Sequence, residues 1–310
     1  MSMVINQRIK FERILCPIGL TADSGDALRY AIALARAYRA KLLVMHCIAA
    51  YAAAGPMDQY HVETSLQDLI AKHLFPHSDS FDMDVTVVDG DPQIAITREA
   101  AERQIDLIVM RSRRRPYAAA LLGSTAETLC RTAPCPVLIT HPREQEWVGA
   151  TNNEVSLQRV LVAHDFSDDS ELALSYGLSL AQEYQAELHL LHVLPLRQRS
   201  EAPEIANLPL SAGTAFDKTV NRLRHAVPDE TYLWCRVKHV VREGHPYREV
   251  LDYAQEQMMD LICMGASGTG FGMHALFGSN ADRVLRQASC PTLIARPLKP
   301  MIVSSAAQTR

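Results

Sequence analysis

The stretch Leu261–Ala281, LICMGASGTGFGMHALFGSNA, joins a short apolar run to a series of glycines. Its first four residues are apolar and predict a buried strand. Gly265 and Gly268 follow this run, and Gly278-Ser279 come after nine further residues. Glycines between a buried strand and a helix let backbone amides approach a phosphate, because they lack the Cβ that would block it. The stretch therefore predicts a phosphate-binding loop in an α/β fold.

The glycines do not form either of two common nucleotide-binding signatures. The sequence has no G-x-x-x-x-G-K-[ST] motif, which excludes a Walker-type loop. Gly268-x-Gly270-x-Gly272 lacks the G-x-G-x-x-G spacing of dinucleotide-binding proteins. The pattern that is present, Gly265-x2-Gly268-x9-Gly278-Ser279, resembles the nucleotide-binding loop of the universal stress protein family.

The length and composition are typical of a globular protein, and the chain is long enough for two domains. The chain has 310 residues, of which 48% are hydrophobic and 21% are charged. Its formal net charge of −4 gives no reason to expect nucleic acid or an acidic membrane as a partner. No apolar stretch approaches the roughly 20 residues of a membrane span.

The start of the chain and its cysteines favour a cytoplasmic protein. MSMVINQRIKFER shows neither the apolar core nor the cleavage site of a signal peptide. The seven cysteines contain no C-x-x-C pair, and Cys16, Cys47 and Cys263 fall inside predicted strands. They are expected to be reduced and buried, and a disulfide between Cys130 and Cys135 is not expected.

The two halves of the chain are copies of one domain. Ile14–Thr21 aligns with Val160–Ser167 at an offset of 146 residues, and the later motifs align at an offset of 155. The later pairs are Gly123-Ser124 with Gly278-Ser279 and Cys135-Pro136 with Cys290-Pro291. We predict domains at residues 1–147 and 148–310, joined by a linker at about Pro142–Leu157.

Each half is expected to alternate five strands with four helices. In the second half the predicted strands are 159–164, 187–194, 234–241, 260–264 and 292–296. A helix should begin after Ser167, where acidic residues suit its dipole, and further helices are predicted at 214–226 and 246–258. Apolar strands alternating with amphipathic helices predict a parallel sheet that is covered on both faces.

The resemblance adds the topology and the assembly of the two halves. It implies a Rossmann-like sheet of the adenine-nucleotide-hydrolase type, with strand order 3-2-1-4-5, in each domain. It also implies that the two domains pair through their last strands as an intramolecular pseudo-dimer, which would cover two edge strands. Whether two chains associate further as a homodimer is left open.

A nucleotide site is predicted in the second half. Asp165 ends the first strand of this half and Gly265 ends the fourth, so in this strand order they are neighbours at the switch point. The resemblance implies that Asp165 contacts the adenosine, that Val193 meets the base and that Met264 borders it, while the Gly278-Ser279 region takes the phosphates. The predicted site comprises Ala163, Asp165, Val193, Met264, Gly265, Gly268, Gly278, Ser279 and Asn280, the last departing from the residue type expected there.

The first half keeps the Gly123-Ser124 pair but lacks the aspartate and the loop glycines. Gly19 stands in the place of the aspartate, and Arg111 and Arg114 stand where the loop glycines should be. We therefore expect a degenerate nucleotide site in this half. The basic run Arg111–Arg115 is either a solvated loop or a site for an anion or a partner.

The histidines of the sequence give no clear indication of a metal site or of catalysis. The spacing of His61, His73 and His77 is not that of a zinc site. His164 lies beside Asp165 but has no nucleophile to serve, so we interpret it as a core or rim histidine.

Three functions are compatible with these observations. The first is a cytoplasmic stress-response protein that binds ATP or a related adenine nucleotide in its second domain, with or without Mg²⁺, as a sensor or regulatory module. The second is a slow ATPase or autokinase that uses Mg-ATP, although no carboxylate beyond Asp165 is apparent to hold the metal. The third is a scaffold or partner-binding protein without nucleotide. A nucleotide-binding protein is favoured over an efficient enzyme.

Overall fold

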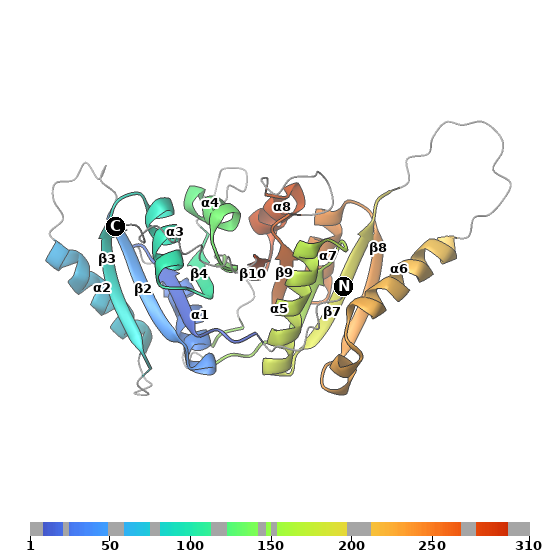
Figure 1. Cartoon of the computed structure of the whole chain (residues 1–310), viewed down its shortest axis with the longest axis horizontal. Helices are drawn as coiled ribbons and strands as arrows, with labels where there is room; N and C mark the ends of the chain where they lie inside the picture. Colours follow the sequence, from blue (N-terminus) through green and yellow to red (C-terminus); the bar gives the residue numbers. More distant parts are fainter. Residues whose placement is uncertain are drawn as a thin grey trace, which may run out of the picture.

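Ten strands from the two halves of the chain form one continuous sheet in the computed structural model (Figure 1). The structure describes residues 9–20, 25–48, 59–74, 81–112, 123–141, 147–149, 154–196, 212–267 and 277–296. The first half contains β1 (Arg13–Pro17), α1 (Gly25–Tyr38), β2 (Lys41–Ile48), α2 (Gln59–Leu74), β3 (Met83–Asp89), α3 (Pro92–Glu102), β4 (Leu107–Arg111), α4 (Ser124–Thr132) and β5 (Val137–Thr140). The second half contains β6 (Arg159–Ala163), α5 (Asp168–Tyr184), β7 (Glu187–Leu194), α6 (Ala212–Ala226), the 3₁₀ turn η2 (Asp229–Leu233), β8 (Val237–Glu243), α7 (Pro246–Glu256), β9 (Leu261–Gly265), α8 (Ser279–Gln287) and β10 (Thr292–Ala295).

The strand order confirms the predicted topology of both halves. The sheet runs β3-β2-β1-β4-β5-β10-β9-β6-β7-β8, which is the order 3-2-1-4-5 in each half. Neighbouring strands within a half are parallel. β5 and β10 pair in the antiparallel sense, with Leu138 opposite Leu293, so the two halves meet through their last strands as predicted.

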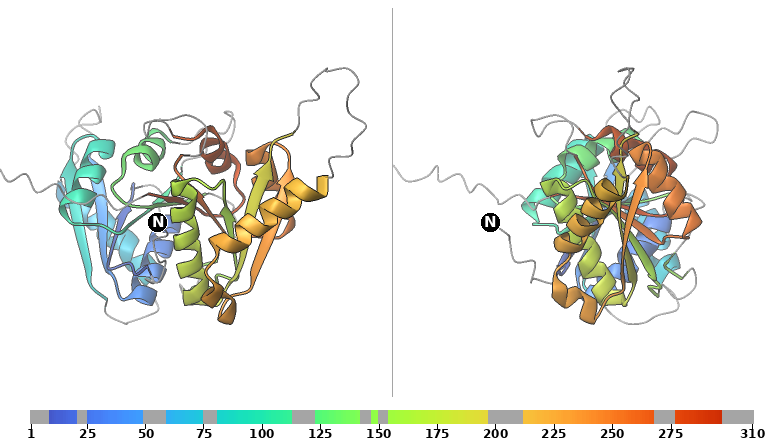
Figure 2. Two further views of the ribbon diagram at one scale, coloured as in Figure 1. Left: turned by 45° about the vertical axis from the view of Figure 1, so that its right-hand side comes forward. Right: turned by 90° about the vertical axis from the view of Figure 1, so that its right-hand side faces the viewer.

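Helices cover both faces of the sheet (Figure 2). One core cluster holds residues of α1, α2, α5 and α6, and the other holds residues of α3, α4, α7 and α8. Successive strand residues alternate between the two: Val160 and Val162 belong to the first cluster, and Leu161 belongs to the second. The strands are therefore buried on both sides, which explains their continuous apolar sequences.

Contacts on both faces join the halves beyond the strand pairing. On one face Phe11 stacks on Tyr176 with ring centroids 6.2 Å apart, and the Ser179 hydroxyl donates to the carbonyl of Ile9 over 2.9 Å. On the other face α4 and α8 lie side by side (Figure 1), and Arg286 of α8 is 3.5 Å from Glu127 of α4. Arg296, just past β10, donates to the carbonyls of Cys130 and Ala133 at the end of α4, each over 2.9 Å.

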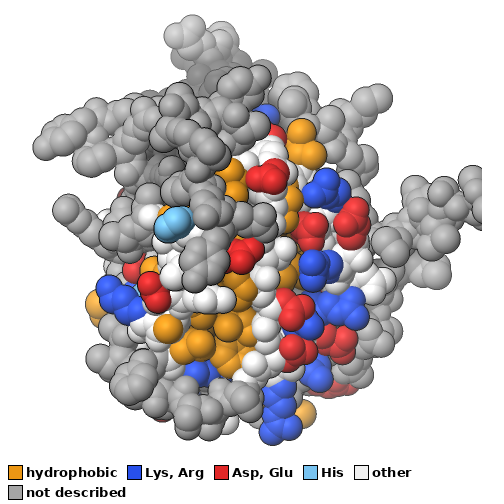
Figure 3. Space-filling view, turned by 90° about the vertical axis from the view of Figure 1, so that its left-hand side faces the viewer, with side chains coloured by type: hydrophobic (Ala, Val, Ile, Leu, Met, Phe, Trp, Pro, Cys, Tyr) orange, Lys and Arg blue, Asp and Glu red, His pale blue; other side chains and the backbone are white. Residues whose placement is uncertain are grey.

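The outer end of the first half combines an apolar area with a band of mixed charges (Figure 3). Its edge strand β3 carries Val85, which is 40% exposed. Asp84 of the same strand pairs with Lys41 over 2.9 Å. Charged side chains along an edge strand disfavour pairing with another chain.

Three predicted boundaries are wrong by a few residues. The strand predicted at 234–241 is β8 and begins at Val237, because the turn η2 precedes it and the amide of Cys235 donates to the carbonyl of Thr231 over 2.8 Å. The helix predicted at 246–258 ends at Glu256, and Met258 takes a left-handed conformation with φ 48°. The helix predicted at 214–226 starts two residues earlier, at Ala212.

The predicted linker is anchored in part. Trp147 is 2% exposed, and its ring meets Tyr30 edge to face with centroids 4.8 Å apart. Val148 forms an isolated antiparallel bridge with Val155. Val148 belongs to the core cluster on the side of α1 and α5, and Val155 packs against it. This part of the connection is therefore packed against the core.

Four histidines that are partly or fully shielded from water are expected to make the fold sensitive to acid. Burial is the main cause that lowers the pKa of His73, His189, His192 and His239. His189 on β7 is 1% exposed, and its Nδ1 lies 2.8 Å from the Tyr253 hydroxyl. These imidazoles stay neutral in the folded protein at pH values where the unfolded chain already binds protons.

We predict that the free energy of unfolding falls as the pH drops through the ordinary histidine pKa of about 6.5, since only the unfolded state takes up these protons there. Urea denaturation across a series of pH values from about 7.5 to about 5.5 measures the slope. The variant His189→Gln should show a shallower slope than the wild type. Equal slopes for the two proteins would contradict the assignment to His189.

Candidate functional site

The carboxyl ends of β7, β6 and β9 lie beside one another at one edge of the sheet. β6 is the middle strand and pairs in parallel with both neighbours. Ala163, Val193 and Met264, at or next to the strand ends, belong to or pack against the core cluster on the α7 and α8 side. The structure thus brings the three apolar residues of the predicted site together at the switch point.

The turn from β6 to α5 holds Asp165 in a fixed orientation. Its Oδ1 accepts hydrogen bonds from the Ser167 amide, over 3.1 Å, and from the Ser167 hydroxyl. Ser167 is also the N-cap of α5 and accepts from the amide of Ser170. Phe166 between them has φ 64°, an uncommon conformation for a residue with a bulky side chain. The half-buried carboxylate is therefore positioned by its own turn.

Gly265 lies where the end of β9 meets the first turn of α5. A Cβ on this residue would be 2.7 Å from the Cβ of Asp169 and 2.8 Å from its carbonyl carbon. The Asp169 carboxylate in turn accepts from the amide of Ser267 over 2.9 Å. The glycine thus has a packing role in addition to the predicted role near a phosphate. Sequence reasoning missed Asp169 as a residue that holds the loop, and its only signal was an acidic pair at a helix start.

The start of α8 faces the same edge. The amide of Gly278 donates to the carbonyl of Ala266 over 2.9 Å, which ties the helix start to the end of β9. Gly278 is the N-cap and supplies no side-chain hydrogen bond to the helix. Ser279 and Asn280 are the first helical residues and are exposed. Amides at such a helix start, together with the helix dipole, suit an anion. The predicted Gly268 lies outside the described residues.

In the first half an arginine fills the corresponding position. Arg111 ends β4, as Gly265 ends β9, and its side chain is 14% exposed. Its guanidinium pairs with Asp26 in the first turn of α1. Gly19 offers no carboxylate in the place of Asp165. Arg113, Arg114 and Arg115 lie outside the described residues, so the basic run stays a prediction.

The structure places three of the four histidines considered in the sequence analysis. His164 is buried as expected: its Nδ1 accepts from the Phe166 amide and its Nε2 lies 3.3 Å from Oε1 of Glu171. His61 is exposed on α2, His73 packs near the end of that helix, and His77 lies outside the described residues. Within the described ranges, no group of three or more His, Cys, Asp or Glu side chains could hold a metal ion.

The cysteines are free, and most are buried. None of the seven forms a disulfide, and burial raises the pKa of Cys130 and Cys135 to about 12. Thiols with raised pKa values are poor nucleophiles at neutral pH. No helix in the described part of the chain is both long and apolar enough to cross a membrane.

The variant Gly265→Ala should lose about 1–3 kcal/mol of stability, because the new methyl group meets the backbone of Asp169, which cannot move without displacing α5. The matched variant Gly244→Ala places its methyl against the flexible carboxylate of Glu249 and should lose less. Chemical denaturation of the two variants measures the difference. Equal losses would show that the β9–α5 contact is not tight.

Comparison with known proteins identifies the family of the chain. A universal stress protein of Mycolicibacterium smegmatis is 25% identical to this chain over 301 residues. The alignment covers 92% of this chain and 97% of that protein. The universal stress protein YxiE of Bacillus subtilis is 30% identical over 145 residues, which are 44% of this chain and 98% of YxiE. The crystal structure of a universal stress protein from Archaeoglobus fulgidus shares the fold, with a TM-score of 0.66 at 22% identity, and the match covers 94% of this chain and all of that one. The model of the universal stress protein family matches residues 10–141 and again 156–296, and the chain therefore belongs to this family as a tandem, two-domain member.

Proposed function

We propose that the chain binds an adenine nucleotide, ATP in the first place, at the carboxyl edge of its second half and acts as a sensor or regulatory module of a stress response. The observation that carries this proposal is that a carboxylate held by its own turn and a helix start without a side-chain cap follow the carboxyl ends of two neighbouring strands, β6 and β9. Asp165 is held by Ser167, and the start of α8 is tied to β9 through Gly278. One group suits ribose or base donors, and the other suits phosphate oxygens.

The roles within this site follow the order of the strands. Asp165 accepts hydrogen bonds from the adenosine part, and Ala163, Val193 and Met264 provide the apolar surface for the base. The amides of Gly278, Ser279 and Asn280 take phosphate oxygens, with Gly265 and Gly268 giving them room. Mg²⁺, where it accompanies the nucleotide, would be held mainly by the phosphates.

The first half is proposed to carry no second copy of this site. Arg111 and Asp26 form an ion pair where the glycine loop would receive phosphate, and Gly19 removes the acceptor for adenosine. We accordingly expect one nucleotide per chain. The domains 1–147 and 148–310 would then differ in function while sharing a fold.

A cytoplasmic location and the state of assembly are part of the proposal. Seven free cysteines suit a reducing compartment. The β5–β10 pairing covers the edges that separate domains would use to associate, so the pseudo-dimer lies within one chain. A further homodimer would use other surfaces.

We predict about one adenine nucleotide per chain after purification, or on saturation with ATP, and a dissociation constant at least about tenfold higher for Asp165→Ala, because a charge-assisted hydrogen bond is lost. Isothermal titration calorimetry measures both quantities. Asp168→Ala is the matched control, since it removes an exposed carboxylate three residues away and should leave the affinity unchanged.

Each outcome of this experiment separates the candidate functions. Two nucleotides per chain would show that the first half also binds. No binding, with no thermal shift on adding ATP and Mg²⁺, would leave the scaffold function. Phosphate release above background by the wild type, lost in Asp165→Ala, would establish the ATPase instead of the sensor.

A further inference from the structure

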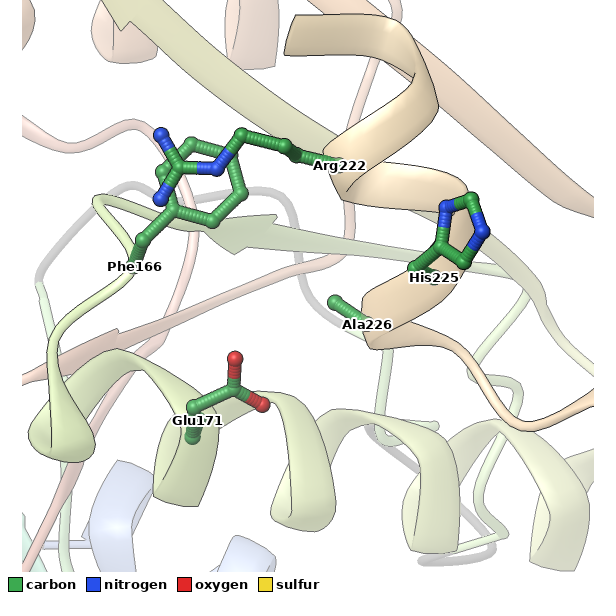
Figure 4. A pocket seen from close by; sticks show the side chains of 5 residues that line it. All are labelled: Phe166, Glu171, Arg222, His225 and Ala226. Atoms are coloured by element: carbon green, nitrogen blue, oxygen red, sulfur yellow. The ribbon is translucent and has the colours of Figure 1, made fainter. Parts of the chain in front are cut away.

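A pocket of about 300 Å³ lies between α5 and α6, outside the predicted nucleotide site (Figure 4). Its lining residues are Phe166, Glu171, Arg222, His225 and Ala226. None of them is among the nine residues predicted to bind nucleotide. The volume is at the lower end of the range for small-molecule sites, which suits a ligand much smaller than ATP.

Arg222 presents an exposed cation to this pocket. Its guanidinium lies over the Phe166 ring, 3.7 Å from the centroid, as Figure 4 shows. The ring itself is held from its other sides by His164 and His192, with centroids 4.9 and 4.7 Å away. Stacking orients a guanidinium without using its hydrogen-bond donors. No ion pair joins Arg222 to a carboxylate of the described residues.

Glu171 presents the opposite charge from α5. In Figure 4 its carboxylate points toward the space between the two helices, and the side chain is 42% exposed. One oxygen, Oε1, lies 3.3 Å from Nε2 of the buried His164, which leaves Oε2 toward the pocket. Because Nδ1 of His164 accepts from the Phe166 amide, Nε2 carries the proton, and although it lies near Glu171 it makes no hydrogen bond with the described residues. The two charges line one pocket without pairing with each other.

His225 adds a third polar group. Its Nδ1 lies 2.6 Å from the carbonyl of Asn221 in the preceding turn of α6. This contact uses Nδ1 as the donor and leaves Nε2 as an acceptor on an exposed side chain. Together with the methyl group of Ala226, it completes a pocket with polar ends and an apolar middle.

The first half shows that the fold does not require this pocket. At the repeat offset of 146, the ring and the carboxylate are replaced by Leu20 and Gly25. The imidazole of His73 fills the space there, since a Cβ on Gly25 would lie only 2.1 Å from its Nε2. Two of the residues that line the pocket in the second half thus differ in the first half, where an imidazole lies beside Gly25.

We propose that this pocket is a second ligand site and that it takes a small zwitterion, a molecule with one carboxylate and one ammonium group such as an α-amino acid. The carboxylate pairs with Arg222, and the ammonium donates to Glu171 and to Nε2 of His225. An anion without an ammonium group would meet the repulsion of Glu171, and a cation without a carboxylate would meet that of Arg222.

The test is a titration of the full chain, labelled with ¹⁵N, with L-valine as the probe. Binding should shift the amide signals of residues 166–171 and 222–226. Isovalerate and isobutylamine are valine without its ammonium and without its carboxylate, and each should bind at least about tenfold more weakly. Arg222→Met and Glu171→Gln should each weaken L-valine binding by at least about tenfold.

Arg224→Met is the matched control, because Arg224 is exposed on the same helix and does not line the pocket. It should bind L-valine as the wild type does. Glu171→Gln also disturbs the contact with buried His164, so Arg222→Met decides if the other variant does not fold. No shift up to the solubility limit of L-valine, or unchanged binding by Arg222→Met, would overturn the site. Isovalerate binding as tightly as L-valine would overturn the zwitterion class.

Discussion

The antiparallel pairing of β5 with β10 is the constraint on which the rest of the structure depends. Each half would otherwise end in an unpaired strand with a row of free amide and carbonyl groups. Joining them makes one sheet of ten strands and places Tyr38 of α1 beside Tyr184 of α5, and α4 beside α8. The arrangement also fixes where the outer edges lie, at β3 and β8, and both carry charged side chains. The pairing of two short strands thus makes one sheet of the two halves, and contacts on both faces support it.

Both halves have the same hydrogen bonds from backbone amides to an aspartate at the amino ends of the strands. Asp106 accepts from the amides of Glu12 and Arg13, and Asp260 accepts in the same way from those of Gln158 and Arg159. Such carboxylates hold the start of the first strand of each half against the start of the fourth. Their presence in both copies, whether or not the copy carries nucleotide-binding residues, assigns them to the fold. A brace near the carboxyl ends is shared as well, since His46 and His192 each bond through Nδ1 to the carbonyl that precedes the aspartate position.

Much of this architecture was predictable because it depends on local patterns that repeat. Continuous apolar strands and the duplicated motifs led to two parallel α/β domains, and the family resemblance led to the strand order and to the pairing of the last strands. The start of β8 was not predictable, since the turn η2 is set by the packing of Thr231 and its neighbours and not by periodicity. Asp169 was missed for a related reason: its contact with Gly265 and Ser267 joins residues almost one hundred positions apart. The space between α5 and α6 depends on side chains from three elements, and no local pattern reports it.

The differences between the halves gather at the carboxyl edge of the sheet and on the helices beside it. There the first half has Gly19 in place of the carboxylate of Asp165 and Arg111 in place of Gly265. Its His73 lies against Gly25, at the place that corresponds to the pocket between α5 and α6. In an open parallel sheet this edge is free to change, because loops and helix starts there do not hold the strands together. The ion pair of Arg111 with Asp26 places protein charge at the end of β4, where β9 of the second half ends in Gly265. If the proposed nucleotide site is correct, the first half supports the fold and covers one edge of the second half, and the second half alone binds the ligand.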